Sequence, residues 1–98
     1  MGFKDAKRKV IDCLNTGHVL HEQRDAIDVK NLLAIGAVSI NDVTQIIKRA
    51  RGNSYSFSPH HYDETIDVHV LRTEFAGLKW YIKWYFVEPD SVFISVHN

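Results

Sequence analysis

The spacing of apolar residues along the chain changes near residue 54. Before this point they recur every three or four positions, as on one face of an α-helix. After it they alternate with polar residues, as in a β-strand. Helices followed by strands favour an α+β fold with the helices on one face of an antiparallel sheet. We predict one domain over residues 1–98, mainly helical over 1–53 and mainly antiparallel strands over 54–98.

Three helices are expected in the first half. The first covers residues 4–15 and ends at Gly17, and the second covers residues 21–33. The third begins after Ser39, a residue type that accepts hydrogen bonds from the free N–H groups of a helix start. Asp42 follows three residues later, where its carboxylate can complete a capping box.

The second half predicts a sheet of three to four antiparallel strands. A short alternating run over residues 55–58 precedes three longer runs over 66–71, 78–87 and 91–97. A turn at residues 88–90 and a loop with a glycine connect the last three runs. Such short connections make successive strands antiparallel neighbours.

Alternation gives this sheet two unlike faces, because successive side chains of a strand point to opposite sides. Large apolar side chains of the longest strand indicate the core face: Leu78, Trp80, Ile82, Trp84 and Phe86. Branched apolar residues of its neighbours are assigned to the same face: Ile66, Val68, Val70, Val92, Ile94 and Val96. The opposite face then collects Asp67, His69, Lys79, Tyr81, Lys83, Tyr85, Phe93, Ser95 and His97. A one-residue bulge would invert part of this assignment.

Two interpretations of the polar face follow. It is either a solvated surface, as antiparallel sheets often have, or a site for RNA. Interleaved lysine and tyrosine side chains bind phosphates and stack on bases in single-strand binders. Histidine transfers protons near neutral pH, and RNA cleavage needs such an acid and base together with a cation for the phosphorane charge.

The overall charge restricts the class of partner. Twelve Lys and Arg residues balance twelve Asp and Glu residues, so the net charge is zero with neutral histidines. A dedicated duplex-DNA binder is normally basic overall, so any nucleic-acid site here must be local. One cluster of basic residues in the second half of the sequence comprises Arg72, Lys79 and Lys83.

Metal binding, disulfides and membrane insertion are not expected. His60, His61, Asp63 and His69 lack the spacing of a zinc site and suggest a polar loop. Cys13 is the single cysteine, so an internal disulfide cannot form. The chain contains no apolar run near the roughly 20 residues of a membrane span and no signal-peptide segment, which predicts a cytoplasmic protein. No cofactor is expected.

Several co-linear stretches resemble the motility-quorum-sensing regulator toxins (MqsR). The matching stretches are residues 62–70, Gly77, residues 80–83 and residues 92–97. Scattered apolar positions of the first half agree as well, so the resemblance spans nearly the whole chain. A second resemblance, over residues 36–43, is to the DUF4258-type small domains.

Both resemblances imply a fold similar to the RelE-type ribonuclease toxins. The resemblance to MqsR further implies a toxin that cleaves single-stranded mRNA and is inhibited by a cognate antitoxin protein, and this cleavage needs no metal. Tyr81 falls where the resembled family has an active-site tyrosine, and His97 falls within one position of a basic active-site residue. The lysine expected just after Tyr55 and the glutamine expected near Val68 are absent.

The expected site follows from the polar face and the resemblance together. Tyr81, His97 and His69 are the expected catalytic residues, and no metal ligands are expected. The expected RNA-binding residues are Arg72, Lys79, Lys83 and Tyr85. The alternative is a non-catalytic module of the same fold that binds a protein through a sheet edge or its exposed aromatic residues.

Overall fold

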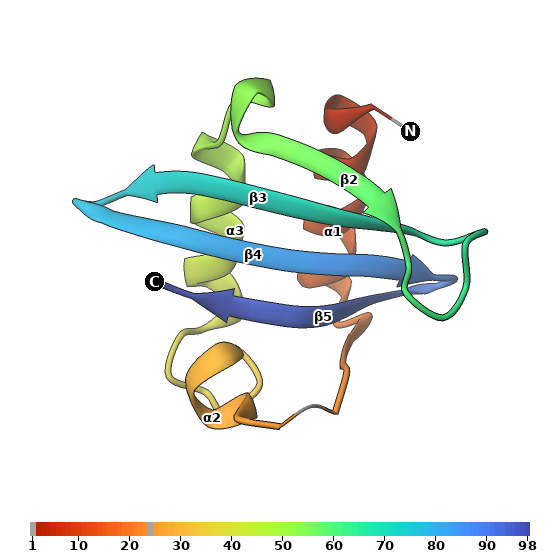
Figure 1. The fold of residues 1–98 in the computed structure, drawn as a ribbon. Coiled ribbons are helices and arrows are strands. Elements are labelled where there is room, and N and C mark those ends of the chain that lie inside the picture. Colours follow the sequence, from red (N-terminus) through yellow and green to blue (C-terminus); the bar gives the residue numbers. More distant parts are fainter. Residues whose placement is uncertain (1, 24) are drawn as a thin grey trace.

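Two helices pack behind one sheet in the computed structural model, which describes residues 2–23 and 25–98 (Figure 1). These helices are α1 (Phe3–Thr16) and α3 (Ile40–Arg49). The strands are β1 (Val19–His21), β2 (Tyr55–Pro59), β3 (Asp67–Phe75), β4 (Leu78–Val87) and β5 (Asp90–His97). A short helix α2 (Ile27–Lys30) and a 3₁₀ turn (Gly52–Ser54) complete the elements of the described residues.

The α+β class predicted from the sequence is confirmed, but the predicted sheet is wrong in two respects. Over the described residues the sheet has five strands in the order β1-β5-β4-β3-β2. It is mixed, because β1 pairs with β5 in parallel while all other neighbours are antiparallel. The missed strand, β1, lies in the half predicted to be helical. Its three residues are too few to show alternation.

The ends of the two long helices follow the sequence signals. Gly17 closes α1 with a φ of 77°, a left-handed conformation that glycine adopts without a Cβ clash. At the start of α3, Ser39 Oγ accepts the N–H of Asp42 at 3.0 Å. Asp42 Oδ2 accepts the N–H of Ser39 at 2.9 Å, so the predicted capping box is confirmed.

The helix predicted over residues 21–33 is wrong. His21 ends β1, and of the described residues in this range only Ile27–Lys30 is helical. The following residues instead attach to the sheet: the N–H of Leu32 donates to the carbonyl of Val96 at 2.7 Å, beside a fully buried Asn31. Leu33 of this segment joins the core whereas Val29 is 62% exposed, so its apolar residues do not form one helical face. Arg24, within the predicted helix, lies outside the described residues.

The hydrophobic core lies between the sheet and helices α1 and α3. Its fully enclosed side chains come from both layers: Val10, Leu14, Val43, Ile46, Ile47, Leu71, Ile82, Trp84, Phe93 and Val96. Burying one large apolar side chain stabilises the fold by about 1.5–3 kcal/mol. Figure 1 shows α1 and α3 on the same side of the sheet, with α2 beside the β5 edge. Neither long helix covers the other face.

The predicted faces are confirmed for the middle of β4 and wrong for most of β3. Trp80, Ile82 and Trp84 of β4 are buried, as expected, whereas Leu78 at the start of the strand is 49% exposed. On β3, however, His69 lies directly opposite Trp84, and Val70 lies opposite Lys83. Since opposed residues of antiparallel strands share a face, His69 points into the core and Val70 points to the polar side. The register is one residue away from the predicted one.

A bulge inverts half of β5. Ser95 lies opposite Lys83 and Phe93 lies opposite Trp84, so Ile94 is the extra residue between them. Phe93, predicted to face away from the core, is fully buried. Beyond the bulge the prediction is confirmed: Val96 is buried and His97 lies opposite Tyr81 on the polar face.

Within residues 2–23 and 25–98, no helix combines the length and apolar character needed to cross a membrane.

Candidate functional site

A row of three side chains crosses the open face of the sheet. Arg72 of β3, Tyr81 of β4 and His97 of β5 lie directly opposite one another on adjacent strands. The Arg72 guanidinium carbon is 5.0 Å from the centre of the Tyr81 ring. The Tyr81 and His97 rings are stacked, with centroids 5.1 Å apart and an interplanar angle of 21°. The strand register thus brings a cation, a phenol and an imidazole into one continuous contact.

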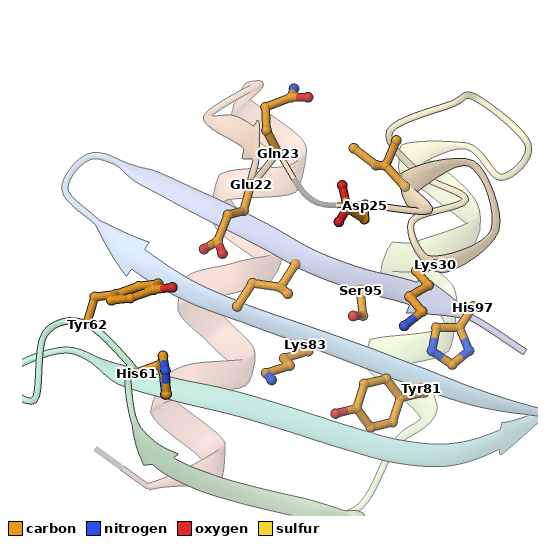
Figure 2. Close-up of a pocket in the computed structure, with 12 residues that line it drawn as sticks. Glu22, Gln23, Asp25, Lys30, His61, Tyr62, Tyr81, Lys83, Ser95 and His97 are labelled. Carbon is orange, nitrogen blue, oxygen red and sulfur yellow. The ribbon is translucent and has the colours of Figure 1, made fainter.

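A groove of about 1120 Å³ runs along this face beside the row. Its floor is formed by strand residues: Tyr81, Lys83, Ile94, Ser95 and His97. One wall contains Glu22, Gln23, Asp25, Ile27 and Lys30, and the other contains His61 and Tyr62. Figure 2 shows the two walls on either side of Lys83 and Ser95, with Lys30 above His97. The groove exceeds the roughly 300–1,000 Å³ of small-molecule sites, so an extended ligand fits it.

The two walls meet at one end of the groove. Glu22 follows β1 and His60 follows β2, which are the opposite edges of the sheet. Their side chains nevertheless approach each other, with His60 Nε2 and Glu22 Oε2 3.6 Å apart. The His60 ring also contacts Tyr85 edge-on, at a centroid distance of 4.8 Å. The expected RNA-binding residue Tyr85 is therefore half-buried next to the contact between Glu22 and His60.

The expected cations all lie on the polar face but in different surroundings. Lys83 stands opposite Ser95 in the floor of the groove. Lys79 lies on the other side of the row, opposite Glu74 of β3, in a second hollow that Arg72 also lines. Tyr81 and His97 line both hollows. The row therefore separates the two hollows, with Lys83 in one and Lys79 in the other.

The structure separates His69 from Tyr81 and His97, which corrects its expected place on the polar face. His69 is only 2% exposed and its Nδ1 is 2.6 Å from the Tyr55 hydroxyl. Its ring stacks on Trp84 at a centroid distance of 5.5 Å, beneath the helices. Burial lowers the pKa of His69 to about 4, so the imidazole is neutral at pH 7. This histidine stabilises the core and does not reach the groove.

The charge of the site is mixed. Arg72, Lys79, Lys83 and Lys30 provide positive charge, and carboxylates of Glu22 and Asp25 lie in the groove wall. Among the described residues, no group of three or more His, Cys, Asp or Glu side chains is placed to hold a metal ion. The chemistry available from these residues is proton transfer by imidazole and phenol, with ammonium and guanidinium groups beside them.

Sequence periodicity missed the residues of the groove walls. Lys30 was expected inside a longer helix, and His61 and Tyr62 in a polar loop without a site. They reach the groove because the segments after β1 and β2 turn over the open face of the sheet (Figure 2). Loop residues show no hydrophobic periodicity in the sequence. Only the adjacent histidines His60 and His61 set this loop apart, because histidine is a residue type often found in sites.

Comparison with protein-family models and with curated protein sequences found no match to this chain.

Proposed function

We propose that this protein is a metal-independent endoribonuclease that cleaves single-stranded RNA on the open face of its sheet. The observation that carries the proposal is the row of Arg72, Tyr81 and His97 in contact across three strands. A rigid strand framework holds the acid/base groups beside cations, as general acid–base cleavage of a phosphodiester requires. The groove is large enough for several nucleotides.

The reaction uses the ribose 2′-hydroxyl as nucleophile. His97 accepts the proton of the 2′-hydroxyl while the 2′-oxygen bonds to phosphorus. The bond from phosphorus to the 5′-oxygen breaks, and the leaving oxygen takes a proton from the Tyr81 phenol. Lys83 and Arg72 stabilise the negative charge of the phosphorane. The products are a 2′,3′-cyclic phosphate and a 5′-hydroxyl end, and proton exchange with water restores both side chains.

The proposed biological role is that of the toxin in a type II toxin–antitoxin pair. Helices on one face of the sheet and a site on the other are what the resemblance to MqsR and the RelE-like fold implies. In this role the substrate is mRNA, the place of action is the cytoplasm, and the second partner is a cognate antitoxin protein. Zero net charge suits such an enzyme only if RNA contacts are confined to this face.

Cleavage of a 5′-labelled single-stranded RNA in the presence of EDTA tests the activity. We expect fragments ending in 2′,3′-cyclic phosphate, and a rate lowered about 100-fold or more by His97→Ala, since general acid–base groups contribute roughly 10²–10⁴-fold. Tyr81→Phe removes only the hydroxyl and should slow cleavage while leaving the ring stack intact. His18→Ala replaces an exposed histidine outside the groove and serves as the control. Absence of cleavage by the wild type would refute the proposal, as would full activity in the Tyr81→Phe, His97→Ala double variant.

A non-catalytic interaction module is the second candidate, and the edge strand β2 favours it. β2 is the last strand of the sheet, four of its five residues are exposed, and none is charged. Phe57 is 54% exposed there. Natural edge strands usually carry charges that discourage pairing with other chains, so an uncharged edge suits strand addition by a protein.

Expression in growing bacterial cells separates the two candidates. A ribonuclease toxin arrests growth, and the His97→Ala variant relieves the arrest at equal protein level. A binding module leaves growth unchanged with either sequence. A short adjacent gene that encodes a DNA-binding antitoxin would further support the toxin.

A further inference from the structure

A second hollow adjoins the groove across the Tyr81–His97 row. It has a volume of about 450 Å³ and lies along the β3–β4 hairpin. Its lining includes Arg72, Glu74, Lys79, Trp80, Tyr81 and His97. Because Tyr81 and His97 line both hollows, a ligand that reacts at the row can extend into either one. The second hollow has the size of a single small-ligand site.

The strand geometry places one lysine in each hollow. Lys79, Tyr81 and Lys83 alternate along β4 and therefore share a face. Two residues of a strand span roughly 7 Å, so each lysine stands about that far from the tyrosine along the strand. A single RNA strand that follows β4 with its reacting phosphate at the row brings one neighbouring nucleotide to Lys83 and the other to Lys79.

The remaining groups of the second hollow suit a nucleotide better than a free phosphate. Arg72 and Lys79 are exposed cations that attract a phosphate. Glu74, directly opposite Lys79, repels a bare phosphate but accepts hydrogen bonds from the N–H groups of a base.

We propose that the second hollow binds the nucleotide adjoining the cleaved phosphodiester, on the opposite side from the nucleotide over Lys83. Lys79 and Arg72 contact its phosphate, and Glu74 contacts an N–H group of its base. The inference rests on the proposed ribonuclease function and adds a second, base-reading subsite to it.

Binding is measured separately from cleavage with a fluorescein-labelled hexanucleotide of 2′-O-methyl RNA and fluorescence anisotropy. The methyl group blocks the nucleophile, so the probe binds but cannot be cut. We expect Lys79→Ala to raise Kd about five- to tenfold, the effect of losing one charge-assisted contact. Lys4→Ala, at an exposed lysine of α1 behind the sheet, is the matched control and leaves Kd unchanged.

Glu74→Ala distinguishes base reading from simple phosphate attraction. Loss of a base contact weakens binding, whereas removal of a repelling carboxylate from a phosphate site strengthens it. Tighter binding by Glu74→Ala, or an unchanged Kd for Lys79→Ala, overturns the inference even if the wild type cleaves RNA. Conversely, Lys79-dependent binding without cleavage of unmodified RNA supports the subsite and refutes only the ribonuclease. A wild type that does not bind the probe overturns both.

Discussion

At the scale of single residues, His69 is held in an environment that disfavours its charge. Aromatic rings surround it, with Tyr55 and Trp84 stacked on the imidazole and Phe86 tilted against it. Among the described residues, the hydrogen-bond partner of its side chain is the Tyr55 hydroxyl. Burial also raises the pKa of that tyrosine, so both partners stay neutral at pH 7.

The lowered pKa of His69 predicts a loss of stability in mild acid. Above pH 6.5 the imidazole is neutral in the folded and unfolded chains, and it does not alter stability with pH. Between pH 6.5 and about 4, the unfolded chain binds a proton that the folded chain rejects. Stability therefore falls with decreasing pH, by up to about 3 kcal/mol from this residue. His69→Gln should flatten the dependence in this range, measured by urea unfolding at pH 7 and pH 4.5.

Three other groups also make stability depend on pH. Burial lowers the pKa of His21, and hydrogen bonds lower the pKa values of Asp42 and Asp63, so each adds a loss of stability of the same sign as the pH falls. The informative quantity is thus the difference between wild type and His69→Gln. His18→Gln, at an exposed histidine, should keep the wild-type slope. An equal slope in His69→Gln would contradict the assignment of this acid sensitivity to His69.

At the scale of elements, the bulge in β5 decides which residues reach the groove. Before the bulge Phe93 packs into the core, and after it Ser95 and His97 face the groove. If β5 had no bulge, strict alternation over residues 91–97 would place Phe93 on the same face as His97. The bulge thus allows a large core residue and two site residues to occupy odd positions of one strand.

Two phenylalanine substitutions test this register. Phe93 is fully buried, whereas Phe57 on edge strand β2 is 54% exposed. We expect Phe93→Ala to lower the free energy of unfolding by about 3–5 kcal/mol, the usual cost of a buried phenylalanine. Phe57→Ala should cost less than about 1 kcal/mol, as for most surface substitutions. Chemical denaturation measures both, and similar costs for the two variants would mean that Phe93 does not lie in the core.

These elements also show what the sequence could predict. The long regular runs were reliable: α1, the capping box of α3, and the alternation of β4 match the structure to within about a residue. The predicted core face of β3 was wrong because residues 66–71 carry apolar side chains at both odd and even positions. The pairing of His69 with Trp84 and of Val70 with Lys83 decides which set faces the core. For the site, the row of Tyr81 and His97 followed from period two, whereas the loop walls depend on tertiary contacts.

At the scale of the whole molecule, the site is formed where the two edges of the sheet fold back over its open face. The long helices fill one side, so the segments after β1 and β2 have only the other side to cross. These segments meet at Glu22 and His60 near one end of the groove, and Lys30 and His97 lie at the other end. The same topology that buries the core therefore creates a concave polar surface.

The charge balance of the molecule predicts how the proposed RNA binding depends on salt. Net charge is zero, and the open face offers Arg72, Lys79, Lys83 and Lys30 to phosphates. Single-stranded nucleic acid gives a slope of about −0.7 per neutralised phosphate in a plot of log affinity against log salt. Four contacts therefore predict a slope of at most about −3, measured with the 2′-O-methyl hexanucleotide between low and moderate NaCl. Lys83→Ala should make this slope shallower by roughly 0.7, whereas Lys4→Ala should leave it unchanged. A slope much steeper than −3 would contradict the confinement of RNA to this face, because it would require basic residues outside it.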